Sequence, residues 1–546
     1  MPGNDYDKKQ ATLSMMSIIE RLNRGRKSHA VPVVRTLVGA CALLLSLHVQ
    51  GNEAIQRAAE EGDLAALEQM LRAEENVNTP MLDGSTALHW AALRDQAEVV
   101  SFLLERGADV EARNRNGVYP LYLAALNGSA KVTSLLLEAG ADPNAELPNG
   151  ETVLMTAART GAPEVLELLL SYGALVDKRD PEFQQTALMI AARENHPAAV
   201  DVLLRYGAEV NLHTRIGPPI VHIPPCKGTG CGSEGVGINR SGVPDRGERY
   251  EQKGGMTALL YAAREGNTEV ARSLLKAGAD IEATEVNGIG PLLMAVLNNQ
   301  QDTAYLLLEH GANVNVEDFW GRTPLYAAVD YRNLDLNSSI EDSPTTNYVD
   351  REPIFALIKR LLDAGADVNA QTREWPPEKK WLYALNDVSW VDMTGRTPFI
   401  RAAESGDVRV MRLLLEYGAD PHITTYGGTN ALMAAAGVNW TVAQTYTESD
   451  ESSLEAVRLC LELGLDVNAT NSMGLTALLG AANRGFNDMI VLLAENGARL
   501  DVRDAVGRTA LRWAEGVFLA AVGAQQKPET IALLKELLSK QGLPHE

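Results

Sequence analysis

The chain has 546 residues, 45% of them hydrophobic, and its formal net charge is −22 at pH 7. Hydrophobic content at this level argues against a wholly disordered chain and allows a packed core. Residues 1–35 carry seven Lys/Arg against three Asp/Glu, so the rest of the chain sums to −26. The chain after residue 35 lacks the basic stretch with which proteins usually bind nucleic acid. This excludes an ordinary DNA- or RNA-binding protein.

The first predicted element is an export signal. Basic residues from Arg21 to Arg35 precede an apolar run of fourteen residues, 36–49, and Gly51 opens the polar sequence that follows. This order is typical of a secretory signal, and the run is short for a membrane span. Residues 1–51 are therefore predicted as a basic region with a signal peptide, which places the protein in the periplasm or outside the cell. The alternative is an uncleaved anchor that holds the protein to a membrane through residues 36–49.

After residue 51 the sequence repeats. Repeats that begin at Gly84, Gly117 and Gly150 follow one another at 33 residues. Residues 52–80 resemble a degenerate additional repeat at the N-terminal end. The pattern resumes at Gln184, Gly255, Gly288, Gly321, Gly395, Gly428, Gly474 and Gly507, which makes eleven repeats, the last of them a C-terminal cap.

Each repeat predicts two helices. A threonine such as Thr86 precedes a short alanine-rich helix, where its hydroxyl can accept a hydrogen bond from the first turn. The second helix has one apolar face, as at Val132, Leu135 and Leu136, and a glycine such as Gly140 ends it. A single repeat is too small to be stable by itself, because its apolar faces are covered only by its neighbours. We expect the repeats to stack.

These repeats resemble the ankyrin repeat. The motif reads "TALHWAA" at residues 86–92, "TPLYAAV" at 323–329 and "TPFIRAA" at 397–403, and several repeats end in "GADVNA" or a close variant. The resemblance covers roughly residues 52–540. It implies an all-α repeat solenoid of stacked helix-turn-helix repeats with hairpin-like loops, and a concave groove lined by the loop tips and first helices. Together with the signal and the long insertions, it is similar to exported bacterial ankyrin proteins.

Some repeats depart from the family pattern. Only His89 keeps the histidine of the motif. Gln184 replaces the hairpin glycine, and Gly290 and Asn430 replace the capping threonine. We expect these repeats to be packed less tightly.

Four insertions interrupt the period, dividing the repeats into residues 52–215 and 254–546. Residues 216–253 hold eight Gly and five Pro, a composition that favours loop over helix or strand. Residues 333–352, with five acidic residues against one Arg, and residues 437–453, with no Lys or Arg, each fall between the two helices of a repeat. Residues 374–392 follow a second helix, as residues 216–253 do, so both should leave from the hairpin side.

The insertion at residues 374–392 is the most aromatic part of the chain. It contains Trp375, Trp381, Tyr383 and Trp390. Large apolar side chains of this kind either pack on the groove of their own chain or contact a partner. Trp90 and Tyr261 follow the histidine position of the motif on first helices and are further candidates for partner contact.

The sequence offers little catalytic chemistry. Cys226 and Cys231 are close enough for a local disulfide in an exported protein, and a metal site there would need further ligands. Cys460 lies in an apolar helix and is predicted to be a core residue. "GCGSEG" at residues 230–235 lacks the strand and helix that a dinucleotide site requires. We predict no catalytic residue, no cofactor and no metal site.

The sequence therefore predicts a non-catalytic scaffold that binds a partner protein through the concave groove and the aromatic insertions. It predicts no nucleic-acid partner, and a membrane association only if the N-terminal apolar segment is retained. The alternative is a redox-active or metal-binding protein that uses the loop with Cys226 and Cys231.

Overall fold

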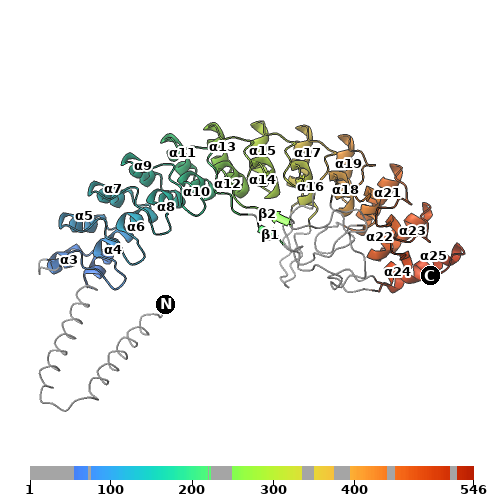
Figure 1. The fold of residues 1–546 in the computed structure, drawn as a ribbon, viewed down its shortest axis with the longest axis horizontal. Coiled ribbons are helices and arrows are strands. Elements are labelled where there is room, and N and C mark those ends of the chain that lie inside the picture. The colour runs from blue at the N-terminus through green and yellow to red at the C-terminus, as the bar shows by residue number, and fades with distance from the viewer. Residues whose placement is uncertain are drawn as a thin grey trace, which may run out of the picture. The chain divides into compact units, whose positions relative to one another are not determined.

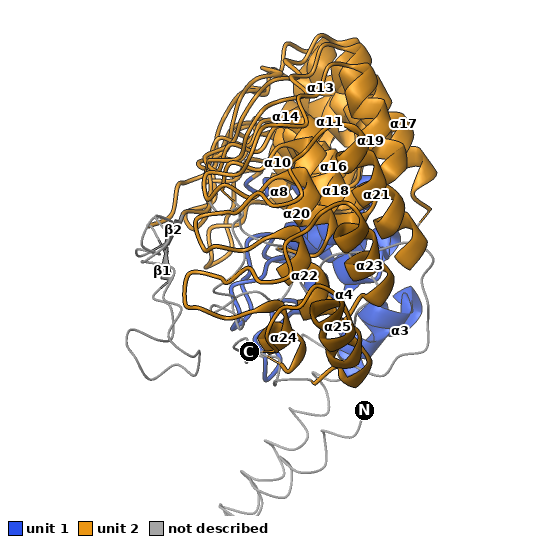
Figure 2. Ribbon diagram, turned by 90° about the vertical axis from the view of Figure 1, so that its right-hand side faces the viewer, with its two compact units in different colours: residues 1–142 blue, residues 143–546 orange. Residues whose placement is uncertain are grey.

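The computed structural model describes residues 54–71, 76–218, 220–222, 249–334, 350–373, 394–438, 449–516 and 526–545. The chain divides into two compact units, residues 1–142 and 143–546, which Figure 2 shows in blue and orange. Within the described ranges, both units consist of short paired helices (Figure 1). This confirms the predicted all-α repeat solenoid.

Unit 1 contains a helix over residues 54–61 and the following helices: α3 (Leu64–Leu71), α4 (Ala87–Leu93), α5 (Ala97–Glu105), α6 (Pro120–Leu126) and α7 (Ala130–Glu138).

Unit 2 contains the other helices and two short strands. These are α8 (Val153–Thr160), α9 (Pro163–Ser171), α10 (Ala187–Arg193), α11 (Pro197–Arg205), β1 (Ile220–His222), β2 (Arg249–Glu251), α12 (Ala258–Glu265), α13 (Thr268–Lys276), α14 (Pro291–Leu297), α15 (Gln301–Glu309), α16 (Pro324–Arg332), α17 (Glu352–Asp363), α18 (Pro398–Ser405), α19 (Val408–Glu416), α20 (Ala431–Ala435), α21 (Asp450–Glu462), α22 (Ala477–Arg484), α23 (Asn487–Glu495), α24 (Ala510–Ala514) and α25 (Pro528–Lys540).

The helices of unit 2 form two layers, each built from equivalent helices of successive repeats. First helices pack on first helices, as α10 does on α8 and α12, and second helices pack on second helices, as α11 does on α9 and α13. Alanine pairs such as Ala191 and Ala192 are fully buried on the first helices. Their small side chains let neighbouring helices approach closely, so the core runs continuously between the repeats of this unit.

The helix ends follow the residues that the sequence places there. The side chains of most threonines before first helices accept a hydrogen bond from the amide three residues later, as Thr323 does from Tyr326. Asn430 accepts the same bond from Met433, so it replaces the capping threonine. At Gly290 no side chain caps the helix, and Pro291 opens it instead. Gln184 adopts the left-handed conformation of the glycine that it replaces, with φ at 58°.

An asparagine near the start of several hairpins joins neighbouring repeats. The amide Nδ2 of Asn315 donates to the carbonyl of Gly365 at 3.1 Å, and its Oδ1 accepts from the amide of Asp367 at 2.7 Å. This pair of bonds caps the end of the second helix of the next repeat, where carbonyls lack helical partners. The same pair recurs at Asn78 in unit 1 and at Asn144, Asn211, Asn369 and Asn468 in unit 2.

The motif histidine of unit 1 also joins two repeats. The Nδ1 of His89 accepts from the amide of Thr86 at 3.1 Å, so its Nε2 carries the proton and donates to the carbonyl of Val118 at 3.0 Å. His89 is 2% exposed, and burial lowers the pKa of its imidazole below the ordinary value of 6.5. The neutral ring is therefore part of the folded structure.

Unit 1 should lose stability as the pH falls through 6.5. The unfolded chain takes up a proton at His89 before the folded chain does, and protonation of Nδ1 removes the acceptor for Thr86. The expected loss is at most about 1.4 kcal/mol per pH unit. Hydrogen exchange of residues 86–93 at pH 7.5 and 5.5 measures it. The non-titrating variant His89→Gln should show a smaller pH dependence, and an unchanged pH dependence would contradict this role.

Candidate functional site

The hairpin turns between repeats are closed by side chains as well as by the backbone. In the turn before α16, Asp318 Oδ1 accepts from the amide of Arg322 at 2.9 Å, and the amide of Gly321 donates to the carbonyl of Asp318 at 2.9 Å. Asp180, Thr214, Glu285, Thr372, Thr425, Asn471 and Asp504 hold the same position and accept the same kind of bond in other turns of unit 2. The turns are therefore fixed by side chains that stand three or more residues before the first helix.

From the tip that carries Phe183 onward, each hairpin tip in unit 2 is joined to the next by a backbone hydrogen bond. The amide of Phe319 donates to the carbonyl of Asn287 at 2.9 Å, and the amide of Arg373 donates to the carbonyl of Trp320 at 2.9 Å. The further bonds of this series run from Arg215 to Phe183, from Val286 to Gly254, from Tyr426 to Thr394, from Ser472 to Gly427 and from Ala505 to Met473. The tips are thus in fixed register along the unit.

The glycine-rich insertion and the aromatic insertion both interrupt the hairpin turn at the same point. In the series of bonds between tips, Arg215 and Arg373 donate to the preceding tip, while Gly254 and Thr394 accept from the following tip. Residues 216–253 lie between the first pair, and residues 374–393 lie between the second. The turns still close, because Thr214 and Thr372 accept from the amides of Met256 and Arg396 at 2.9 and 3.0 Å. The insertions therefore leave the stacked repeats unchanged.

The first insertion begins and ends as a two-stranded ribbon. Strands β1 and β2 pair antiparallel, with Val221 opposite Tyr250. This differs from the loop that the composition predicted, because the pairing of the hairpin continues outward before the glycine-rich part begins. Gly254 is required at the base, since a Cβ there would lie 1.9 Å from the carbonyl oxygen of Arg215.

The hairpin tips carry large apolar side chains exposed to solvent. In unit 2, Phe319 is 64% exposed and Tyr426 is 61% exposed. Phe319 makes an edge contact with Trp320 at 5.7 Å between ring centroids. Phe183, Ile216 and Val506 are also exposed on the tips of this unit. We call these five exposed residues the tip surface: Phe183, Ile216, Phe319, Tyr426 and Val506. All five residues stand in hairpin turns of this unit.

The predicted groove positions on the first helices are mostly filled by packing. Tyr261 is 6% exposed, and its hydroxyl accepts from Gln185 Nε2 at 2.7 Å. Arg401 and Trp513 follow the histidine position of the motif in their own repeats, and they are 2% and 1% exposed. Trp90 in unit 1 is half-buried, and its Nε1 has no acceptor in the described part of the chain. Partner contact at Trp90 and Tyr261 stays a prediction.

The other predicted site residues lie outside the described residues. These are Trp375, Trp381, Tyr383 and Trp390 in one insertion and Cys226 and Cys231 in the other. The proposed disulfide and the aromatic contacts stay predictions. Cys460 is fully buried in α21, as predicted, and burial raises the pKa of its thiol to about 12. A thiol in this environment is not a nucleophile at neutral pH.

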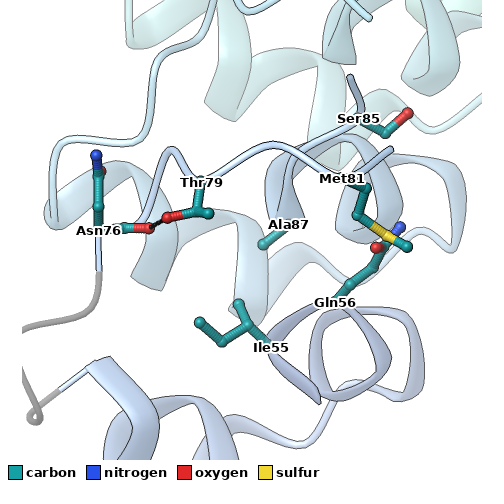
Figure 3. A pocket seen from close by; sticks show the side chains of 7 residues that line it. All are labelled: Ile55, Gln56, Asn76, Thr79, Met81, Ser85 and Ala87. Atoms are coloured by element: carbon teal, nitrogen blue, oxygen red, sulfur yellow. Dashed lines mark hydrogen bonds between the residues drawn. The ribbon is translucent and has the colours of Figure 1, made fainter. Parts of the chain in front are cut away.

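A small cavity lies in unit 1 beside the helix over residues 54–61. Ile55, Gln56, Met81 and Ala87 line it together with Asn76, Thr79 and Ser85 (Figure 3). Its volume of about 10 Å³ accommodates a single water molecule but no substrate or cofactor. Among the described residues, no cluster of three or more His, Cys, Asp or Glu could hold a metal ion.

The family models match where the repeats lie. A model of three consecutive ankyrin repeats matches residues 55–146, 121–214 and 259–337, and a model of one ankyrin repeat matches residues 394–426. The chain is an ankyrin-repeat protein. Ankyrin repeats indicate a protein-interaction domain, and the matched residues contain helix pairs of both units.

Curated relatives match only short parts of this ankyrin-repeat protein. Palmitoyltransferase akr1 of Schizosaccharomyces pombe is 46% identical over 56 residues, which are 10% of this chain and 9% of the relative. Ankyrin repeat domain-containing protein 40 of Homo sapiens is 38% identical over 61 residues, 11% of this chain and 17% of the relative. The chain thus spans less than a fifth of each of these relatives, and their activities do not carry over to it.

A solved ankyrin structure is also similar. The ankyrin repeat domain of human ASB11 is 26% identical, with a TM-score of 0.37, and the match covers 47% of this chain and 98% of that domain.

The helices of the described ranges fall short of a membrane span, since none of them reaches both its length and its hydropathy.

Excision of residues 374–393 should leave the ankyrin stack intact. The deletion joins Arg373 to Thr394 and regenerates an ordinary turn with Thr372 and Gly395 in place. The free energy of unfolding, from urea unfolding followed by circular dichroism, should stay within about 1 kcal/mol of the native value.

A deletion of the same length that removes residues 376–395 is the matched control. It places Trp375 where the left-handed Gly395, with φ at 74°, ordinarily stands, which should cost about 1–3 kcal/mol. Equal effects of the two deletions would refute the insertion point.

Proposed function

We propose that this ankyrin-repeat protein is a non-catalytic scaffold that binds a partner protein through the tip surface. The observation that carries the proposal is the exposure of Phe183, Phe319 and Tyr426 on tips that the backbone holds in register. Hydrogen bonds between successive tips hold the backbone that carries these side chains before binding, so little backbone conformational entropy is lost on association. Aromatic side chains in such positions are typical binding hot spots.

The tip surface also lies where the two hairpin insertions start. Arg373 and Thr394 bound the aromatic insertion, and each is bonded to the tip that carries Trp320 or Tyr426. We propose that Trp375, Trp381, Tyr383 and Trp390 extend the same contact surface, together with the concave groove. The acidic chain, with a formal charge of −22, favours basic partners by electrostatic steering.

Serine substitutions at two tips should weaken partner binding without unfolding the protein. The variant with Phe319→Ser and Tyr426→Ser should lose about tenfold or more of the partner captured from host extract, because both rings are exposed anchors. Its unfolding free energy should change by about 0.5 kcal/mol or less. Quantitative mass spectrometry of the captured proteins measures the loss.

The matched control has serines in place of two exposed tyrosines outside the hairpin tips. Tyr172 and Tyr206, 45% and 41% exposed, stand at the ends of second helices, away from the tips. The variant with Tyr172→Ser and Tyr206→Ser should capture the partner as the native protein does. If both variants lose the partner equally, or neither does, the tip surface is not the recognition element.

We also propose that the protein is exported. The basic residues up to Arg35 and the apolar run at 36–49 support a signal that is removed near Gly51. Mass spectrometry of the mature N-terminal peptide should find a chain that begins close to residue 51. A chain that retains residues 36–49 would instead support the membrane-anchored form.

A further inference from the structure

Helix α16 ends differently from the other first helices in the described ranges. Those helices end at a residue in the left-handed conformation, such as Gly266 (φ 79°), Asn299 (φ 59°), Gly406 (φ 69°) and Gly485 (φ 75°). The residue at the equivalent position of α16 is Arg332, which is helical. The helix is capped by Asn333 with φ at −104°, and none of the described residues 332–334 is left-handed.

This end leaves carbonyl groups that need other partners. The last carbonyls of a helix have no donors within it, and a left-handed residue normally supplies them by turning the following amides inward. At α20, which also precedes an insertion, Gly437 does so: its φ is 108°, and the next amide, that of Val438, donates to the carbonyl of Met433 at 2.9 Å. After α16, the amides of Asn333 and Leu334 donate to the carbonyls of Asp330 and Tyr331 at 3.0 and 3.4 Å, and Asn333 Nδ2 donates to that of Val329 at 2.9 Å. Among the described residues, the carbonyls of residues 332–334 receive no backbone donor.

Three arginines supply the missing donors. Arg401 Nη2 donates to the carbonyl of Asn333 at 2.8 Å. Arg351 donates through Nε to the carbonyl of Arg332 at 2.9 Å and through Nη2 to that of Leu334 at 3.3 Å. Arg332 Nη1 donates in turn to the carbonyl of Arg351 at 2.5 Å. The carbonyls of residues 332, 333 and 334, where the chain leaves α16, and of residue 351, where it returns to α17, are therefore all bonded to guanidinium groups.

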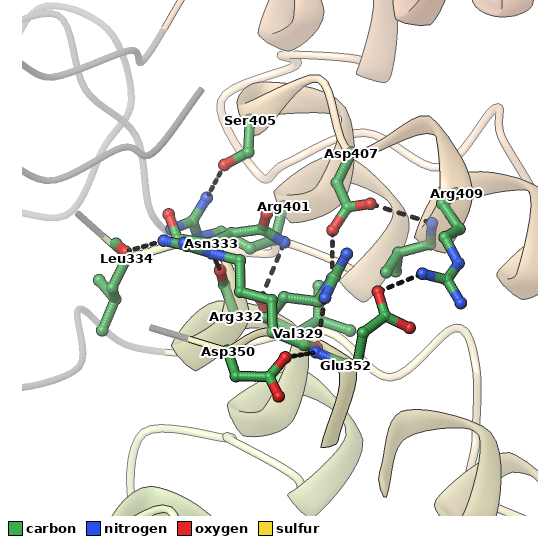
Figure 4. Close-up of polar contacts among 12 residues, drawn as sticks. Val329, Arg332, Asn333, Leu334, Asp350, Glu352, Arg401, Ser405, Asp407 and Arg409 are labelled. Atoms are coloured by element: carbon green, nitrogen blue, oxygen red, sulfur yellow. Dashed lines mark hydrogen bonds and ion pairs between the residues drawn. The ribbon is translucent and has the colours of Figure 1, made fainter. Parts of the chain in front are cut away.

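Carboxylates and a hydroxyl hold these arginines in place. Arg401 Nε pairs with Asp330 at 2.6 Å, and its Nη1 donates to Ser405 at 2.8 Å. Arg332 Nε pairs with Asp407 of the next repeat at 2.7 Å (Figure 4). Arg332 is 7% exposed and Arg401 is 2% exposed, so both guanidinium groups need this full set of partners.

The position of Asp407 shows that this arrangement replaces another one. In other repeats, the residue twelve positions after the first one donates to a carbonyl at the end of the preceding first helix. These residues are His196, Asn267 and Gln300. Asn267, for example, donates to the carbonyl of Ala192 at 2.8 Å. Asp407 holds this position and has no proton to donate. It accepts from Arg332 instead, and Arg401 takes over the donation.

We propose that Arg332, Arg351 and Arg401 form a clamp that fixes where the chain leaves α16 and where it returns to α17. In this repeat the clamp supplies hydrogen-bond donors to the carbonyls at the end of the first helix, as the residues after the left-handed residue do in the other repeats. It lets the repeat accept the insertion at 335–349 between its two helices while α16 stays packed against α18. Arg401 is thus a positioning residue for the chain rather than a groove residue that contacts a partner. The proposal does not depend on the proposed function.

Hydrogen exchange in the full-length chain tests the clamp. The variant Arg401→Met should raise exchange of the amides of Asn333, Leu334 and Phe355 by about tenfold or more, because a charge-assisted bond at each end of the segment is lost or loosened. Exchange in the repeats from Gly474 onward should stay as in the native chain. The variant Arg401→Lys keeps the charge but cannot reach Asp330, Ser405 and Asn333 together, so it should not restore protection.

Arg409→Met is the matched control. Arg409 pairs with Glu352 beside the clamp, but both side chains are more than half exposed, so its loss should leave the amides of Asn333 and Leu334 unchanged. Arg409 also stacks on the ring of Phe355 at 3.8 Å, so the control is compared at these two amides and not at Phe355. Unchanged protection in Arg401→Met, restored protection in Arg401→Lys, or equal effects of Arg401→Met and Arg409→Met would each overturn the proposal. Increased exchange confined to the α16–α17 connection in both Arg401 variants supports it.

Discussion

Register between neighbouring repeats is the constraint on which the rest of this structure depends. A repeat of about 33 residues cannot bury enough apolar surface by itself, so each one is stable only against the next. Alanine faces such as Ala191–Ala192 pack closely only when neighbouring repeats are aligned at one relative position. Two kinds of hydrogen bond hold that offset: the asparagine bonds at the base of the hairpins and the backbone bonds between their tips. Asn211 and Asp280 are 69 residues apart in the sequence and still make the bond.

This register also underlies the partner contact that we propose. On the first helices, Tyr261 and Arg401 are held in contacts between repeats, Tyr261 with Gln185 and Arg401 with Asp330 and Asn333. The tips have fewer neighbours, and their backbone is already held in place. An exposed ring such as that of Phe319 therefore costs the fold little and remains available for contact.

The sequence was sufficient to predict the fold because the relevant signals are local. Threonine caps, alanine pairs and glycine stops give the order of helices directly, and the 33-residue period gives the stacking. Local signals did not show which side chains are buried. The spacing places Tyr261 on a helix face, but its burial depends on Gln185, which is 76 residues away in the sequence. Gln184 adopts a left-handed conformation that its residue type does not suggest. The three arginines around α16 come from two repeats, and no pattern within either one brings them together.

The insertion point in the hairpin turn has a consequence for how such a protein can diversify. Residues 216–253 and 374–393 differ in length and composition, yet both enter at the same peptide position and leave the helices in phase. The entropy of closing a longer loop rises only with the logarithm of its length. New sequence can therefore accumulate there almost without a stability penalty. A lineage could exchange its binding specificity by swapping these segments while the helical framework stays constant.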